Sequence, residues 1–156
     1  MTVDALLAGR CADPHAILGA HPAPDGVVVR VYRPDATAVR VLVADTVVEL
    51  ARVRPEGLFE GTVAGARLPL AYELEVAYPD GNAFRIQDPY RFGPTIGELD
   101  LHLAGEGRHE ELYERLGAHV REVDGVSGTA FAVWAPSTPC GSAMRPATRA
   151  STLALT

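Results

Sequence analysis

Between residues 27 and 86 the chain alternates apolar and polar positions with a period of two, which is typical of half-buried β-strands. The clearest case is Val27–Tyr32, where Val27, Val29 and Val31 alternate with Val28, Arg30 and Tyr32. Segments of this kind are predicted at residues 27–32, 39–43, 47–50, 58–63, 72–78 and 82–86.

Turn-forming residues separate these segments, at Pro24–Gly26, Pro34-Asp35, Pro55–Gly57 and Pro79–Asn82. Glycine accepts the positive φ of tight hairpin turns, so Asp-Gly between two alternating segments predicts an antiparallel hairpin. Short strands at such spacing predict a mostly β fold, namely an immunoglobulin-like antiparallel β-sandwich. The strands do not alternate with helices, which argues against a doubly wound nucleotide-binding fold.

Two stretches have helical patterns instead. Residues 2–18 predict short helical pieces, with Asp13-Pro14 as a helix start, because Asp can cap and Pro is preset for the first helical position. A connector at 95–117 has apolar residues at helical spacing and then a second helical piece that ends at Gly117.

The chain also contains an internal repeat. Leu-Gly-Ala-His occurs at residues 18–21 and again at 116–119, and each copy leads to an Asp-Gly turn and a strand that ends in aromatic-x-Pro. Three marks in the same order predict two tandem modules of one architecture, the second of them incomplete. We expect His21 and His119 to be hydrogen-bonded residues at the start of each module rather than metal ligands.

Residues 137–156 differ from everything before them. They contain no Asp or Glu, although the chain has 20, and they show neither a period of two nor a helical face. Such a segment cannot offset its ordering entropy by burial, so we expect disorder. Two interpretations stay open: the segment is either an out-of-frame reading of a GC-rich gene or a genuine flexible tail. The absence of lysine from the chain is a further sign that the gene is GC-rich.

These patterns divide the chain into segments of different character. We predict an N-terminal helical segment at 1–19, a first β-sandwich domain at 20–93, a helical connector at 94–117, the start of a second sandwich at 118–136 and the tail at 137–156. The predicted fold class is therefore mostly β, with short helices at the N-terminus and in the connector, followed by an incomplete second sandwich.

Composition and charge exclude several function classes. The net charge of −6 argues against a nucleic-acid partner, because phosphate binding needs clustered cations. No apolar segment approaches the ~18 residues of a membrane span, and no secretory signal is evident, so we expect a cytoplasmic protein without a membrane partner. The two cysteines, Cys11 and Cys140, form neither a disulfide framework nor a metal pattern. We expect no cofactor and no metal.

Several segments resemble the opening of bacterial 1,4-α-glucan (glycogen) branching enzymes. They are Asp13–His21 with Arg30–Ala36, then Asp88–Pro94, Tyr113–His119 and Gly125–Pro136. The resemblance extends from about residue 13 to residue 136. It implies an architecture in which this first sandwich precedes a second one similar to family-48 carbohydrate-binding modules, a glycoside hydrolase family 13 barrel and a C-terminal β-domain.

The resemblance also implies a reaction for the complete enzyme. Members of this family cleave an α-1,4-glucan and transfer the piece to a 6-hydroxyl, a retaining transglycosylation that needs two carboxyl groups about 5 Å apart. In the family these groups lie on the barrel, and the match ends at Pro136, so we assign no catalytic residue and expect no branching activity from this chain alone.

The resemblance gives the first sandwich a role in positioning the glucan. The implied partners are α-glucan (glycogen or maltooligosaccharide), bound weakly, and in the complete enzyme the second sandwich and the catalytic barrel. The alternative is a stand-alone carbohydrate-binding or interaction module without an enzymatic parent.

Three aromatic residues are candidates for glucan contact or for packing between modules. Tyr90 and Phe92 lie in Asp88–Phe92, and their rings can stack on sugars. The structural alternative for this segment is a turn at Asp88-Pro89 with both rings packed. Trp134 is likewise either a sugar platform or a core or inter-module residue.

Overall fold

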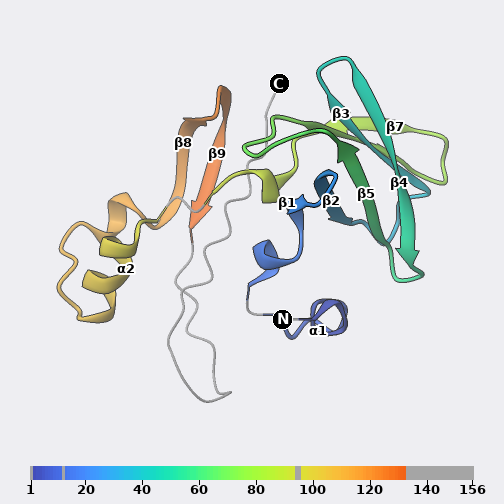
Figure 1. Cartoon of the computed structure of the whole chain (residues 1–156). Coiled ribbons are helices and arrows are strands. Elements are labelled where there is room, and N and C mark those ends of the chain that lie inside the picture. The colour runs from blue at the N-terminus through green and yellow to red at the C-terminus, as the bar shows by residue number, and fades with distance from the viewer. Residues whose placement is uncertain (1, 12, 94–95, 133–156) are drawn as a thin grey trace. The chain divides into compact units, whose positions relative to one another are not determined.

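The computed structural model describes residues 2–11, 13–93 and 96–132 of the chain (Figure 1). They form two compact units, which meet in sequence between Arg91 and Phe92. The predictions for Trp134 and for residues 137–156 lie outside the described residues. None of the helices in the described ranges is long and apolar enough to cross a membrane.

The first unit consists of short helical elements and antiparallel strands. In chain order they are α1 (Val3–Leu7), the 3₁₀ turn η1 (Pro14–Ala16), β1 (Gly19–Ala23), β2 (Gly26–Tyr32), β3 (Ala38–Val43), β4 (Thr46–Arg54), β5 (Leu58–Ala64), β6 (Glu73–Ala77), β7 (Ala83–Ile86) and the 3₁₀ turn η2 (Pro89–Arg91). The strands pair in the order β1-β2-β5-β4-β3-β6-β7, and every neighbouring pair is antiparallel. The predicted mostly β, antiparallel fold is confirmed.

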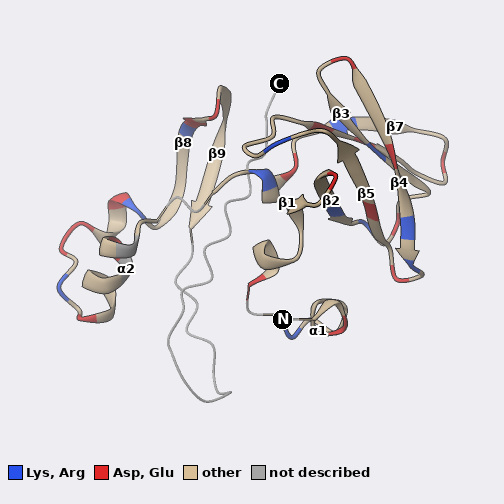
Figure 2. Cartoon of the chain, viewed as in Figure 1, with Lys and Arg blue, Asp and Glu red and all other residues tan. Residues whose placement is uncertain are grey.

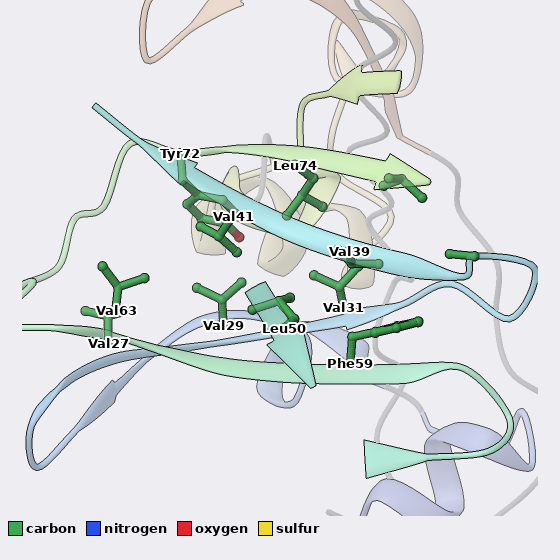
Figure 3. Packing of buried hydrophobic residues seen from close by; sticks show 12 residues of the cluster. Val27, Val29, Val31, Val39, Val41, Leu50, Phe59, Val63, Tyr72 and Leu74 are labelled. Carbon is green, nitrogen blue, oxygen red and sulfur yellow. The ribbon is translucent and has the colours of Figure 1, made fainter. Parts of the chain in front are cut away.

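Strand β4 belongs to both layers of the sandwich. Its first half, Thr46–Leu50, pairs with β3, whereas Ala51–Arg54 pairs with β5 after a register shift between Arg52 and Arg54. An irregularity of this kind bends a strand and increases its twist. The sheet therefore curls, so that β2 and β5 face β3 and β6 with Leu50 between the two layers (Figure 3).

The core of the first unit fills the space between these layers. Successive side chains of a strand point to opposite faces, so the predicted valines at 27, 29 and 31 all point inward and are at most 4% exposed. The buried cluster comprises Val27, Val29, Val31, Ala36, Val39, Val41, Leu50, Phe59, Val63, Tyr72, Leu74 and Val76 (Figure 3).

The outward faces of the strands carry charges of both signs. Figure 2 shows acidic and basic positions interspersed along the strands and turns of the first unit. Arg30 on β2 forms an ion pair with Glu60, its direct partner on β5, and Arg40 on β3 pairs with Glu75 on β6 at 3.0 Å. Opposite charges on directly paired residues support the register of the sheet.

The predicted hairpin turn at Pro79–Asn82 joins β6 to β7. The Gly81 amide donates to the Tyr78 carbonyl oxygen at 3.1 Å, and the Tyr78 amide donates to the Asn82 carbonyl oxygen at 2.9 Å. Gly81 has a φ of +85°, which is the reason that this position favours glycine.

The first strand of the unit was not predicted. Gly19–Ala23 forms β1, which pairs with β2 through all five of its residues. Gly19 and Pro22 interrupt the apolar alternation, and proline cannot donate to a neighbouring strand. β1 tolerates them because it lies at an edge of the sheet, where only one side needs a partner.

The second unit contains one helix, a 3₁₀ turn and a hairpin among its described residues. They are α2 (Glu98–Gly105), η3 (Leu112–Glu114), β8 (Gly117–Val123) and β9 (Val126–Ala132), the last two paired antiparallel. The helical piece predicted before Gly117 is only the single turn η3. Leu112 and Leu116 have helical spacing, but the turn has no buried residue and Tyr113 is 71% exposed, so little burial stabilises a longer helix.

Candidate functional site

The segment Asp88–Phe92, which sequence analysis singled out, begins at a buried carboxyl group. Asp88 is 2% exposed. The Tyr72 hydroxyl donates to its Oδ2 at 2.5 Å, and the Tyr90 amide donates to its Oδ1 at 3.0 Å. Both carboxyl oxygens therefore have a donor, as a buried polar group requires.

The Asp-Pro sequence explains the local geometry. An aspartate side chain that accepts from the amide two residues later forms a turn of its own, and proline presets φ for the position between them. The Arg91 amide also donates to the Asp88 carbonyl oxygen at 3.1 Å, which closes η2. The predicted turn at this segment is confirmed.

Burial dominates the electrostatics of this cluster. Desolvation raises the pKa of Asp88, while hydrogen bonds from Tyr72 and Tyr90 and the nearby charge of Arg33 oppose the increase. Burial also raises the pKa of Tyr72 strongly, and the adjacent Asp88 adds to the effect. Among the described residues, His15 Nε2 and Arg33 Nε are buried nitrogen atoms without a hydrogen-bond partner.

Tyr90 is held by contacts within the first unit. Its ring meets that of His15 edge to face, with centroids 4.9 Å apart. Its backbone lies close to Gly19 on β1, where an added Cβ would come within 2.7 Å of the Tyr90 carbonyl oxygen. Gly19 has a φ of +88°, so both its conformation and its surroundings favour glycine.

The remaining residues of the segment are also placed by contacts or burial. Arg91 Nη1 donates to the Tyr72 carbonyl oxygen at 3.2 Å and to Gln87 Oε1 at 2.9 Å. Phe92 is buried, with 2% of its surface exposed. The geometry brings Tyr90 into a polar cluster around Asp88, and contact of Tyr90 or Phe92 with glucan stays a prediction.

Both repeat histidines are hydrogen-bonded, as predicted, and the structure shows that they make the same bond. His21 Nε2 donates to the Leu18 carbonyl oxygen at 3.1 Å, and His119 Nε2 donates to the Leu116 carbonyl oxygen at 2.8 Å. The glycine after each leucine has a positive φ, +88° in the first copy and +97° in the second. Within the described ranges no group of three or more His, Cys, Asp or Glu side chains could hold a metal ion.

The sequence analysis did not identify one aromatic pair, which consists of the exposed Phe84 and the partly buried Tyr78. Phe84 on β7 is 54% exposed, and its ring meets that of Tyr78 edge to face with centroids 6.1 Å apart. Both residues line a hollow in the first unit. The alternation at 82–86 predicted a strand but gave no sign that Phe84 would lie beyond the edge of the core.

The fold defines the first unit as a β-sandwich module. Asp88 is the one buried carboxylate among the described residues, and it accepts a hydrogen bond from Tyr72 in the interior of the module. Residues 1–90 match the model of the family described as "alpha-1,4-glucan branching enzyme GlgB, N-terminal domain". The chain belongs to this family.

Curated relatives extend the match beyond residue 90. The chain is 51% identical over 128 residues to the 1,4-alpha-glucan branching enzyme GlgB of Myxococcus xanthus, and 52% identical over 140 residues to that of Thermobifida fusca. It is 54% identical over 132 residues to GlgB 1 of Streptomyces coelicolor. These matches cover 82–86% of this chain but only 17–18% of the relatives.

Pullulanases are among the solved structures that the chain matches. The chain matches the pullulanase of Bacillus acidopullulyticus with a TM-score of 0.41 and 23% identity, over 51% of this chain and 10% of that one. A pullulanase of Paenibacillus barengoltzii, complexed with maltotetraose, matches with a TM-score of 0.41 and 19% identity, over 76% of this chain and 21% of that one.

Proposed function

We propose that this chain is the N-terminal, non-catalytic region of a 1,4-α-glucan branching enzyme, and that its first unit helps to position α-glucan chains for the complete enzyme. The match of residues 1–90 to the family of GlgB N-terminal domains carries the proposal. Relatives that are 51–54% identical over the shared region are branching enzymes by name. Glycogen or maltooligosaccharide is the proposed ligand, and the cytoplasm the proposed location.

Catalysis belongs to other parts of such an enzyme. Retaining transfer between glucans needs a carboxylate nucleophile and a second carboxyl group about 5 Å away, both open to substrate. The buried carboxyl group of the described residues, Asp88, is instead occupied by Tyr72 and by a backbone amide. We propose that the chain alone binds glucan weakly and makes no branches.

The segment after β7 has a structural role in this proposal. Its first residue, Asp88, fixes the end of the sandwich through Tyr72, and Arg91 binds the carbonyl of the same tyrosine. We propose that a helical connector follows at 94–117, and that the second sandwich starts at 118–136. Tyr90 and Phe92 then act in packing, and Trp134 in packing between modules.

Two assays on the whole chain test the proposal. Native electrophoresis in gels with and without glycogen should show retardation of the chain in glycogen only. Incubation with amylose should leave the iodine–glucan absorbance unchanged, because no branches form. Unchanged mobility in glycogen would count against a glucan-positioning role, and a fall in iodine absorbance would overturn the assignment as a non-catalytic region.

A further inference from the structure

A hollow at one end of the first unit combines the exposed ring of Phe84 and the partly buried ring of Tyr78 with polar side chains. It lies between the β2–β3 turn, the second half of β4 and the β6–β7 hairpin, and its volume is about 610 Å³. This volume falls in the range of about 300–1,000 Å³ that is usual for small-molecule sites. The lining residues that matter are Asp35, Thr37, Arg52, Tyr78, Asp80 and Phe84, and we refer to this site as the Phe84 hollow.

The rings of Tyr78 and Phe84 lie at the edge of the core of the first unit. Phe84 on β7 pairs directly with Val76 on β6, so their side chains lie on the same face of the sheet. Val76 is fully buried, whereas Phe84 is 54% exposed. Phe84 lines the hollow together with polar side chains, and an apolar ring beside a few polar groups is typical of a small-molecule site.

The polar residues supply both donors and acceptors around these rings. Arg52 is held in place, since its Nη2 donates to the Pro34 carbonyl oxygen at 2.9 Å and its guanidinium group lies 5.4 Å from the Phe59 ring centroid. A guanidinium group has five N–H donors, so others can serve a ligand. Thr37 donates to the Ala77 carbonyl oxygen at 3.1 Å and keeps its oxygen lone pairs as acceptors.

Two carboxylates complete the rim of the hollow. Asp80 accepts from the Asn82 amide at 3.0 Å and from its side-chain nitrogen at 2.7 Å, and these bonds hold the pKa of the exposed Asp80 below its usual value. Asp35 is exposed on the β2–β3 turn. Two carboxylates disfavour a phosphate or another anion, and a single arginine beside them does not reverse this preference.

This combination fits a neutral, polyhydroxylated ligand. Sugar rings present apolar C–H faces to aromatic rings and hydroxyl groups to carboxylates and guanidinium groups. The planes of the Tyr78 and Phe84 rings meet at 61°, so together they form an angled surface rather than a flat one. A curved chain such as an α-1,4-glucan follows an angled surface better than a flat, extended β-1,4-glucan does.

We infer that the Phe84 hollow is a binding subsite for α-1,4-linked glucan, in which Phe84 and Tyr78 contact the sugar faces and Arg52, Asp35 and Asp80 bind hydroxyl groups. The inference rests on the proposed function for the choice of glucan. It goes further by naming the surface and the linkage that the first unit selects.

The test is calorimetric titration of the whole chain with maltoheptaose, and with cellohexaose as the β-linked control. The wild-type chain should bind maltoheptaose and not cellohexaose. Phe84→Ala should weaken binding of maltoheptaose about tenfold or more, the scale expected for the loss of one well-placed aromatic ring. Phe84→Trp, which keeps a ring, should retain binding.

A matched control separates this site from exposed apolar surface in general. Val47 on β4 is 61% exposed and does not line the Phe84 hollow, so Val47→Ala should leave the affinity unchanged. Thermal unfolding of each variant verifies that it is folded under the conditions of the titration.

The outcomes distinguish the subsite from the proposed function. If the wild-type chain is retarded by glycogen but folded Phe84→Ala binds maltoheptaose equally well, the subsite is wrong and the proposed function stands. Equal binding of cellohexaose would overturn the linkage preference. If the wild-type chain binds neither glycogen nor maltoheptaose, both fail, and a protein surface becomes the better occupant of the hollow.

Discussion

Tyr72 and Asp88 lie sixteen residues apart in the sequence and form a 2.5 Å hydrogen bond in the interior of the first unit. Each of the two residues is 2% exposed. Arg91 donates to the backbone carbonyl of the same tyrosine, so the start of β6 and the end of the sandwich are joined by both side chain and main chain. This cluster fixes the point at which the chain leaves the first unit.

Tyr72→Phe should destabilise the first unit. The substitution removes the hydroxyl donor and leaves one buried oxygen of Asp88 without a partner, which costs about 1–3 kcal/mol. Urea unfolding measures the change in the free energy of unfolding. Tyr32→Phe is the matched control, because Tyr32 is a half-buried residue and its hydroxyl group has no hydrogen bond within the described residues. Equal stability of the two variants would contradict the role given to the Tyr72–Asp88 bond.

Asp88→Asn should change how stability depends on pH. The folded-state pKa of Asp88 is raised, mainly by desolvation, so its protonated form is favoured by folding. The contribution of this group is fully present below the ordinary aspartate pKa of about 3.9, and it is lost as the pH rises through the raised folded value. The free energy of unfolding of wild type minus that of Asp88→Asn should therefore fall as the pH increases from about 3.5.

Unfolding of both proteins in urea at a series of pH values measures this difference. Other carboxyl groups titrate in both proteins and cancel in the subtraction. A difference that instead grows with increasing pH would mean that the ionised form of Asp88 is the one stabilised by folding.

Gly19→Ala should lower the free energy of unfolding of the first unit much more than Gly65→Ala does. Both glycines have a positive φ, +88° and +69°, so alanine costs about 1–2 kcal/mol at either site. At Gly19 the new methyl group would also lie 2.7 Å from the Tyr90 carbonyl oxygen, whereas nothing lies within 4 Å at Gly65. Overpacking of this kind adds about 1–3 kcal/mol. Thermal or urea unfolding of the two variants tests the close approach of β1 and η2.

His21 and His119 should have the same neutral tautomer. Each Nε2 lies within hydrogen-bond distance of a backbone carbonyl oxygen, which can only accept, so the hydrogen must be on Nε2. Nitrogen-15 NMR of the neutral imidazole rings reports which nitrogen is protonated. The Nδ1–H tautomer at either histidine would show that the shared hydrogen bond does not form in solution.

The sequence predicts those features that depend on neighbouring residues. The period of two at Val27, Val29 and Val31 identifies an inward face, and Asp80-Gly81 identifies a hairpin. The bond of His21 to Leu18 is also local, since the two residues are three positions apart in the sequence. In each case the physical cause lies within a few residues of its effect.

Features that depend on distant segments were not predictable in this way. β1 contains Gly19 and Pro22, which weaken a strand signal, and it forms because β2 offers a complete edge. The residues around Tyr72 in the sequence do not indicate that it is the hydrogen-bond partner of Asp88. The Phe84 hollow combines residues from the β2–β3 turn, β4 and the β6–β7 hairpin, which only the curl of the sheet brings together.

The most direct test of the account exchanges the first unit between enzymes. In the Thermobifida fusca branching enzyme, which is 52% identical over the shared region, the segment equivalent to residues 1–91 is replaced by that of this chain, and a second variant lacks the segment. Branched products are then debranched and the lengths of the transferred chains are measured. We predict that the exchange restores the chain-length distribution of the intact enzyme, whereas the deletion shifts it. A distribution in the exchange variant that equals that of the deletion would contradict a glucan-positioning role for this unit.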